Sequence, residues 1–382
     1  MLEIPLSGIK KIEEIAKSSS EYISLSQGAI RVGGVPQEIK NYLKELLNTD
    51  KTDYYGSCWG LMDLRQTLAQ TISQQYNITM DLAHIVPTHG CIGGLSLLFL
   101  TLLEHGDEVI IPEPAYPAYE GLAQLARAKA VHISMLKDDI SNGQMWELNV
   151  EKIKSATTSK TKMIVFSNPW NPLGIIVPEE TILELIRWCE EKGIYLVIDE
   201  AYKDFVFEGS LPKIAPLVLQ SPWVISANSF SKNMAMSGWR IGYLLVPKHI
   251  IKALAGMQDA LLNCLNNTAQ HAAIYALKHP EVVQHFHEIV KTNRDRTLQK
   301  FAPLVSQGIF SMEKPAGGFF AFLKTTQPEA TDLVMSILHN AKTSMVPGIA
   351  FGSTGAPFMR LCFARDTLVL EEGLDRILNF FG

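Results

Sequence analysis

The sequence lacks the cysteine pattern of a disulfide framework or a structural zinc site. It holds five cysteines, an odd number, and no two of them form a CxxC pair. Disulfide scaffolds and zinc sites rely on paired cysteines at short, regular spacings. We therefore expect free thiols and a reducing compartment, which indicates a cytoplasmic protein.

Long hydrophobic runs and an excess of basic charge are also missing. The longest apolar stretch, at residues 93–103, falls short of the roughly 18 residues that suggest a membrane span, and a buried helix explains it better. The first 20 residues contain no apolar core of a signal peptide. With a formal net charge of −5 the chain has no electrostatic footprint for nucleic acid or an anionic membrane. We expect neither as a partner.

What the chain does contain is the composition of a globular α/β protein. Its 382 residues are 47% hydrophobic and 19% charged, and a chain of this length favours two domains. Short apolar runs, several of them separated by helix-length segments, predict a largely parallel sheet covered on both faces. The runs lie at 84–88, 107–113, 130–135, 162–168, 194–200, 223–229 and 240–246.

The pattern changes after Pro247. From there to about residue 305 it is helical, and the remainder alternates again as a smaller α/β unit. The first 40 or so residues carry no sheet of their own. We therefore expect an N-terminal segment (1–45) that packs with the small domain, a large domain (46–285) and a small C-terminal domain (286–382).

Polar side chains follow three of the predicted strands at the point where each strand ends. Asn168 and Asn171 follow one strand, Asp199 and Tyr202 follow the next, and the sequence SFSK (229–232) follows a third. Open parallel sheets bind ligands at the carboxyl ends of their strands. Turn chemistry explains each segment alone, but the three together at one sheet edge indicate a site.

A lysine is a nucleophile only when its amine is unprotonated, although its ordinary pKa is about 10.4. A pocket that excludes water or adds positive charge lowers that pKa, and the neutral amine can then bond to an aldehyde. If the aldehyde is that of pyridoxal 5'-phosphate, the site also needs a carboxylate for the ring nitrogen, donors for the phenolic oxygen and cationic or hydroxyl groups for the phosphate. The sequence offers Lys232 for the aldehyde, Asp199 for the ring nitrogen, Tyr202 and Asn171 for the phenolic oxygen, and Ser229, Ser231 and Arg240 for the phosphate.

A second candidate for phosphate binding lies where a glycine turn opens a helix, at Gly90, Cys91 and Ile92. The free amides of a helix N-terminus and the helix dipole favour an anion. Taken alone, this stretch is better explained as a helix start without a ligand.

Together these motifs resemble the class I/II aminotransferases, a family of fold-type I pyridoxal-phosphate enzymes. The resemblance covers nearly the whole chain, and the motifs follow in the family's order. They are YYGSCWGLMDLR (54–65), GDEVIIPEPAYPAY (106–119), NPWNPLG (168–174), DEAY (199–202), SFSKNMAMSGWRIGY (229–243) and PGIAFGSTGAPFMRLCFA (347–364).

The resemblance implies a large domain with a mostly parallel seven-stranded sheet between helices, plus a smaller α/β domain. It implies transfer of an amino group between an L-amino acid and a 2-oxo acid, through a Lys232 aldimine and a pyridoxamine phosphate intermediate. Lys232, Asp199 and Tyr202 would be the catalytic residues. The implied cofactor ligands are these three with Asn171, Ser229, Ser231, Arg240, Gly90, Cys91 and Ile92, and with Tyr116, which would stack on the ring.

The same resemblance extends to substrate and partner. Arg360 would bind the substrate α-carboxylate, with Gly28 and Asn171 beside it, and Tyr55 would reach the phosphate of a neighbouring subunit. A homodimer with composite active sites is thereby implied. The chain departs from the family at Leu173, where threonine is usual, and at Cys91 and Ile92, where small or hydroxyl residues are common; no catalytic position is lost.

Three alternatives to transamination differ in how well the sequence fits them. A lyase, cyclase or decarboxylase on the same fold would use the same lysine, aspartate and arginine, although transamination is the commoner outcome. A ligand-sensing domain fused to a DNA-binding module is disfavoured by the acidic charge and by a resemblance that begins within the first 30 residues. A dinucleotide-dependent dehydrogenase is disfavoured because no GxGxxG follows an early strand. The sequence does not specify the amino acid.

Overall fold

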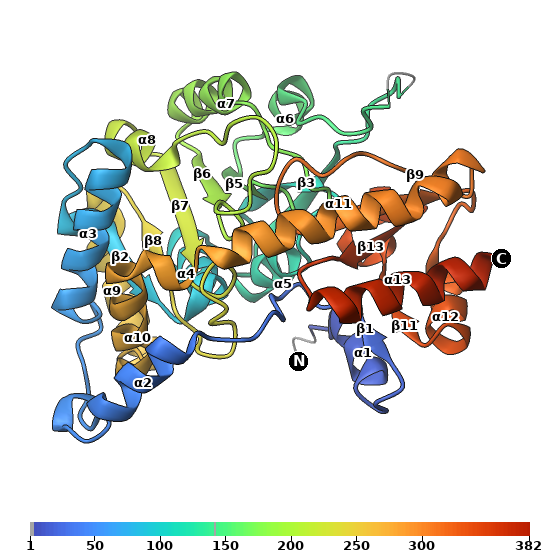
Figure 1. Ribbon diagram of the computed structural model, residues 1–382. Helices are drawn as coiled ribbons and strands as arrows, with labels where there is room; N and C mark the ends of the chain where they lie inside the picture. Colours follow the sequence, from blue (N-terminus) through green and yellow to red (C-terminus); the bar gives the residue numbers. More distant parts are fainter. Residues whose placement is uncertain (1–3, 141–142) are drawn as a thin grey trace.

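A seven-stranded sheet forms the centre of the larger unit of the structure, a computed structural model that describes residues 4–140 and 143–382 (Figure 1). Its strands are β2 (Ile85–Thr88), β3 (Glu108–Glu113), β4 (Lys129–Ser134), β5 (Thr161–Ser167), β6 (Tyr195–Asp199), β7 (Val224–Ser229) and β8 (Gly242–Leu245). The order is β2-β8-β7-β6-β5-β3-β4, and β8 alone runs against its neighbours. All seven predicted strands and the mostly parallel sheet are confirmed.

Helices cover both faces of this sheet because its strands are apolar on both sides. Alternate side chains of β6 enter different cores: Leu196 and Ile198 join one cluster, and Val197 joins the other. The first core also takes residues from α3 (Met62–Tyr76), α6 (Val150–Ala156), α7 (Glu179–Lys192), α8 (Ile214–Gln220) and α10 (Asn267–Lys278). The second takes residues from α4 (Gly90–Leu102), α5 (Ala118–Leu125) and α9 (Ile251–Leu262). The result is a three-layer unit.

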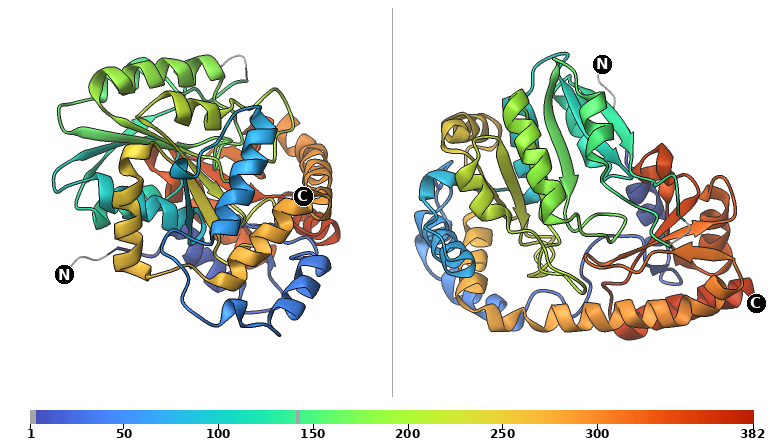
Figure 2. Two further views of the ribbon diagram at one scale, coloured as in Figure 1. Left: turned by 90° about the vertical axis from the view of Figure 1, so that its left-hand side faces the viewer. Right: turned by 90° about the horizontal axis from the view of Figure 1, so that it is seen from above.

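The smaller unit is built on an antiparallel sheet of order β12-β13-β10-β9. Its strands are β9 (Phe310–Met312), β10 (Phe320–Thr325), β12 (Val346–Pro347) and β13 (Phe358–Cys362), and its helices are α12 (Thr331–Asn340) and α13 (Thr367–Phe381). The long helix α11 (His285–Ser306) runs from the larger unit along the smaller one (Figure 2). Asp366 caps α13, since its carboxylate accepts hydrogen bonds from the amides of Leu368 and Val369.

The N-terminal segment contacts both units. β1 (Ile23–Ser24) pairs with β11 (Thr343–Ser344), and α1 (Gly8–Ala16) lies beside the same part of the small unit.

 Helix α2 (Gln37–Leu46), in contrast, packs on α10 of the larger unit. The chain of α1 (Gly8–Ala16) and β1 therefore belongs with the small sheet, and α2 with the large one. The domain limits drawn from the sequence stay a prediction, and residues 1–3 of the first segment lie outside the described residues.

The structure also bears on the membrane question. Among the helices of residues 4–140 and 143–382, none is long and apolar enough to cross a membrane.

The carboxyl ends of β5, β6 and β7 open toward the junction with the small unit, which is where the candidate site lies.

Candidate active site

A cavity of about 450 Å³ lies at the carboxyl edge of the large sheet, between the two units and the N-terminal segment. Most of the residues singled out in the sequence line it. The lining includes Gly28, Cys91, Ile92, Tyr116, Asn171, Asp199, Tyr202, Ser229, Ser231, Lys232, Arg240 and Arg360. Gly90 and Tyr55 are the two candidates outside this lining. The structure thus brings together side chains from segments more than 300 residues apart in sequence.

Asp199, the last residue of β6, is the buried carboxylate that the large sheet contributes to the cavity. Its Oδ1 accepts hydrogen bonds from the amide of Ala201 at 3.0 Å and from the thiol of Cys91 at 3.3 Å, and its Oδ2 accepts one from the Tyr119 hydroxyl at 3.0 Å. Burial raises the pKa of Asp199, although these donors and the charge of Lys232 act in the opposite direction. A cation placed against this carboxylate would keep it ionised and would itself hold its proton.

Tyr119 is a contributor that the sequence reasoning missed. It stands in the first turn of α5, three residues after Tyr116, and the two rings meet edge to face at 5.7 Å. The signal was present in the repeated tyrosine of PAYPAY, because residues three apart in a helical turn lie on one side. Its hydroxyl donates a hydrogen bond to Asp199 and so links this carboxylate to the pair of tyrosine rings.

Lys232 extends into the same cavity from the loop after β7. Its Nζ donates a hydrogen bond to the Gly28 carbonyl at 2.5 Å and lies 5.6 Å from the centre of the Tyr202 ring. Burial lowers the pKa of Lys232 to about 8, helped by the positive charge of Arg360 and opposed by Cys362 and Asp199. Roughly a tenth of the amine is therefore unprotonated at pH 7, far more than for an ordinary lysine, and this neutral form is the nucleophile.

Arg360, on β13, enters the cavity from the small unit. Its Nη1 donates to Asn171 Oδ1 at 3.0 Å and its Nη2 donates to the Ser26 carbonyl at 2.5 Å, while its guanidinium lies over the rings of Phe320 and Phe351. The buried Nε has no hydrogen-bond partner within the described residues. Burial lowers the pKa of Arg360 to about 10. An unsatisfied buried donor on a planar cation suits a carboxylate ligand.

Asn171 and Tyr202 connect this cation to the lysine side of the cavity. Asn171 Nδ2 lies 3.4 Å from the Tyr202 hydroxyl, and the Asn171 amide donates to Ser167 Oγ at 2.9 Å. Both side chains are buried. They provide a pair of hydrogen-bond donors between Lys232 and Arg360.

The other end of the cavity is suited to an anion. The N-terminus of α4 has no side-chain cap, and its residues Cys91 and Ile92 line the cavity with Ser229, Ser231 and Arg240. Gly90 has φ +73°, and a Cβ there would come within 2.6 Å of Arg240 Nη2. Free amides at a helix start, two hydroxyls and a guanidinium are the donor set of a phosphate site.

Glycine is also required where β8 passes this turn. A Cβ on Gly242 would meet the Asn228 carbonyl at 2.5 Å, the Cys91 amide at 2.8 Å and the Gly90 carbonyl carbon at 2.8 Å. These are backbone atoms, so no side-chain movement could make room. The close approach brings the start of α4 beside the loop that carries Lys232.

The remaining wall comes from the N-terminal segment. Ser7, Ile9, Lys10, Glu13 and Gln27 line the cavity beside Gly28. The sequence alone gave no signal for the four residues at or before α1, because an amphipathic helix with one buried face is explained by packing. These side chains close the end of the cavity nearest Arg360.

Tyr55 lies away from this lining and is 85% exposed. Its loop is nevertheless held in place, since the Tyr54 carbonyl accepts a hydrogen bond from Asn267 Nδ2 at 2.8 Å. No group of three or more metal-binding side chains was found in the part of the chain that the structure describes. The chemistry of the cavity is that of a lysine, a carboxylate and two anion-binding ends.

Residues 20–377 match the family model described as "Aminotransferase class I and II". The chain belongs to this family. The motifs predicted that the chain is a class I/II aminotransferase of fold type I, and this prediction is confirmed. Enzymes of this family are generally dependent on pyridoxal phosphate.

Individual relatives agree with the family match. An aspartate aminotransferase of Pyrococcus abyssi is 31% identical over 379 residues, with 97% of this chain and 94% of that protein covered. A Bacillus subtilis protein described as a probable N-acetyl-LL-diaminopimelate aminotransferase is 30% identical over 382 residues, with 99% and 94% covered.

Solved structures share the fold over nearly the whole chain. The aspartate aminotransferase of Thermus thermophilus with maleate superposes with a TM-score of 0.88 at 26% identity, and the comparison covers 99% of this chain and 97% of that one. An aromatic aminotransferase of Pyrococcus horikoshii gives a TM-score of 0.86 at 27% identity, with 96% and 98% covered. The relatives agree on aminotransferase chemistry but carry different substrate names.

The depressed pKa of Lys232 predicts how the cofactor-free protein captures an aldehyde. The rate of pyridoxal phosphate incorporation should rise with pH and level off above a midpoint of about 8, because the protonated amine has no lone pair. Stopped-flow absorbance between about pH 6 and pH 10 measures the rate, and peptide mapping after borohydride reduction locates the modified lysine.

Lys203 is the internal control for this experiment. Burial favours its neutral form, but Tyr243 and Glu200 hold the pKa of Lys203 well above its ordinary value. It should stay unmodified at equal aldehyde concentration. Label on Lys203, or a rate that does not change across this pH range, would contradict the prediction.

Proposed function

We propose that the protein binds pyridoxal 5'-phosphate in the 450 Å³ cavity and uses Lys232 to move an amino group between an L-amino acid and a 2-oxo acid. The observation that carries the proposal is the convergence in one cavity of two buried groups, Asp199 and Arg360, with the half-buried Lys232. The residues fit the cofactor. Asp199 faces the cavity with several donors already fixing it, Arg360 has an unsatisfied Nε, and Gly90, which has no side chain, lets the Arg240 guanidinium lie directly against the turn that begins α4.

Bound pyridoxal phosphate supplies an aldehyde that exchanges amines and a ring that accepts electrons. Asp199 would hold a proton on the ring nitrogen through an ion pair in a site without bulk water. Tyr202 and Asn171 would donate hydrogen bonds to the phenolic oxygen, and Tyr116 would cover one face of the ring. Ser229, Ser231, Arg240 and the amides after Gly90 would bind the phosphate.

The substrate end follows from the same geometry. Arg360 would bind the α-carboxylate through its free Nε edge, and Asn171 would keep the guanidinium in place. The Lys232 Nζ would be the base that takes the proton from the substrate Cα and the acid that gives it back, while the bound cofactor would supply the capacity to accept electrons. The Gly28 carbonyl, 2.5 Å from Nζ, would orient the amine during this transfer.

Replacing Lys232 tests this function directly. Lys232→Ala should abolish transamination and the absorbance band of the cofactor bonded to lysine, because the other lysine of the cavity lining, Lys10, comes from α1 and not from the carboxyl edge of the sheet. Matched measurements on Lys203→Ala, which removes a buried lysine outside the cavity lining, should retain both signals. A Lys232→Ala protein that is yellow and active would refute the proposal.

We further propose a homodimer whose sites take Tyr55 from the partner subunit. The support is the exposure of large apolar side chains on a fixed part of the surface: Tyr54 is 75% and Tyr55 85% exposed, and Leu261 and Leu262 at the end of α9 are 49% and 43% exposed. The Asn267–Tyr54 hydrogen bond places these two segments near each other. Apolar groups exposed together mark interaction surfaces.

A cytoplasmic location stays a prediction.

Mixing two defective variants tests the shared site. Tyr55→Ala should weaken cofactor binding without changing the fold, because its ring makes no buried contact within the subunit. In a mixed dimer with Lys232→Ala, one site combines the intact Lys232 with the intact Tyr55 and should recover wild-type cofactor affinity. If light scattering shows dimers in the refolded mixture but cofactor affinity does not recover, the shared site is contradicted.

A further inference from the structure

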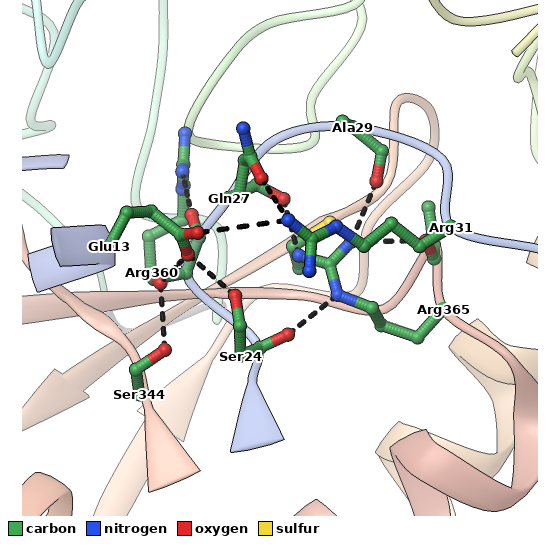
Figure 3. A network of polar contacts seen from close by, with 11 residues as sticks. Glu13, Ser24, Gln27, Ala29, Arg31, Ser344, Arg360 and Arg365 are labelled. Carbon is green, nitrogen blue, oxygen red and sulfur yellow. Dashed lines mark hydrogen bonds and ion pairs between the residues drawn. The ribbon is translucent and has the colours of Figure 1, made fainter. Parts of the chain in front are cut away.

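The segment from Ser24 to Ala29 presents its carbonyl groups in two directions (Figure 3). The Ser26 carbonyl accepts from Arg360 and the Gly28 carbonyl accepts from Lys232, each at 2.5 Å. The carbonyls of Ser24, Gln27 and Ala29 all accept from one other side chain, the guanidinium of Arg365. The segment therefore lies between the two cations of the candidate site and a third cation behind them.

Arg365 is 1% exposed and uses its whole guanidinium on this segment and its own turn. Its Nε donates to the Ser24 carbonyl at 2.7 Å, its Nη2 to Gln27 at 2.5 Å, and its Nη1 to Ala29 at 2.6 Å and to the Ala364 carbonyl at 3.1 Å. No carboxylate lies within ion-pair distance of Arg365 among the described residues. A buried cation is thus balanced by carbonyl dipoles and by the Cys362 sulfur, to which Nη1 donates at 3.5 Å, and this makes the placement of these groups costly to change.

Ladder-type backbone bonds hold this stretch only as far as Leu25, whose amide donates to the Ser344 carbonyl at 3.0 Å and whose carbonyl accepts from the Cys362 amide at 2.8 Å. Its regular structure ends at Ser24, the second residue of β1. On the side away from Arg365, the buried carboxylate of Glu13 accepts hydrogen bonds from the hydroxyls of Ser24 and Ser26, and Ser26 also contacts Ser344 (Figure 3). From Gln27 to Ala29, Arg365 supplies the bonds that a sheet ladder would otherwise provide.

We propose that Arg365 is a positioning residue for the substrate end of the site. By fixing the carbonyls of Ser24, Gln27 and Ala29, it turns the intervening carbonyls of Ser26 and Gly28 toward Arg360 and Lys232. The effect on catalysis rests on the proposed function, because it assumes that Arg360 is oriented toward a substrate α-carboxylate. Lysine cannot replace it, because a single ammonium cannot span three carbonyls that a planar fork reaches at once.

Arg365→Lys is the first test, with Arg294→Lys as its matched control. Arg294 is another buried arginine of the small unit, on α11, and it donates to the Pro315 carbonyl without touching the segment. The probe is the α-methyl form of the amino acid that the wild-type holoenzyme turns over fastest, because it binds but has no Cα proton to lose. Arg365→Lys should weaken probe binding by about tenfold and raise KM more than it lowers kcat.

Cofactor binding separates positioning from general damage. None of the residues assigned to the phosphate or ring nitrogen contacts Arg365, so the dissociation constant of pyridoxal phosphate should stay within about twofold in Arg365→Lys. The idea is overturned if Arg365→Lys binds the probe like the wild type, if it loses cofactor and probe affinity equally, or if Arg294→Lys gives the same loss.

A second measurement does not depend on catalysis. In the cofactor-free protein, the backbone amides of residues 25–31 should exchange hydrogen faster in Arg365→Lys and in the neutral variant Arg365→Gln, whereas those of β6 should not change. Unchanged exchange at 25–31 in both variants would also overturn the inference. Failure of the proposed function would appear differently, as a wild-type protein that transaminates no amino acid while its segment still responds to the substitutions.

Discussion

Burial of charge at the junction of the two units is the constraint on which the site depends. Asp199 and Lys232 come from the large unit, and Arg360 and Arg365 from the small one, and each loses bulk water. Burial raises the pKa of Asp199 and lowers the pKa values of Lys232 and Arg360, to about 8 and about 10. Exclusion of water raises the free-energy cost of burying these charged groups. It also makes the lysine nucleophilic and strengthens every polar contact near it.

The surrounding structure offsets this cost with fixed dipoles, in addition to the attraction between Asp199 and Lys232. Asp199 is held by an amide, a thiol and a phenol; Lys232 by the Gly28 carbonyl; and Arg365 by carbonyls and the Cys362 sulfur. Such groups do not have to reorganise when a charged ligand arrives, which is the condition for effective electrostatic catalysis. The N-terminal segment has a central place because its backbone contacts cations from both units.

The sequence was most informative where chemistry and chain order coincide. The seven strands could be predicted because strands buried on both faces are apolar throughout, and Asn171, Asp199 and Lys232 could be placed together because strands of a parallel sheet end at one edge. Tyr119 was missed although its spacing from Tyr116 was visible. The contacts of Arg365 with Ser24 and Ala29 could not be found, since they join residues more than 330 positions apart and follow from packing rather than from a motif.

The most direct measurement is the half-reaction of the holoenzyme with an amino acid in the absence of any 2-oxo acid acceptor. We expect release of 2-oxo acid in an amount equal to the active sites, with conversion of the cofactor to its amine form and no further turnover. Adding a second 2-oxo acid should then restore the starting spectrum. Release of ammonia or carbon dioxide in place of a stoichiometric amount of 2-oxo acid would contradict transamination, because the same lysine, aspartate and arginine would then serve elimination or decarboxylation.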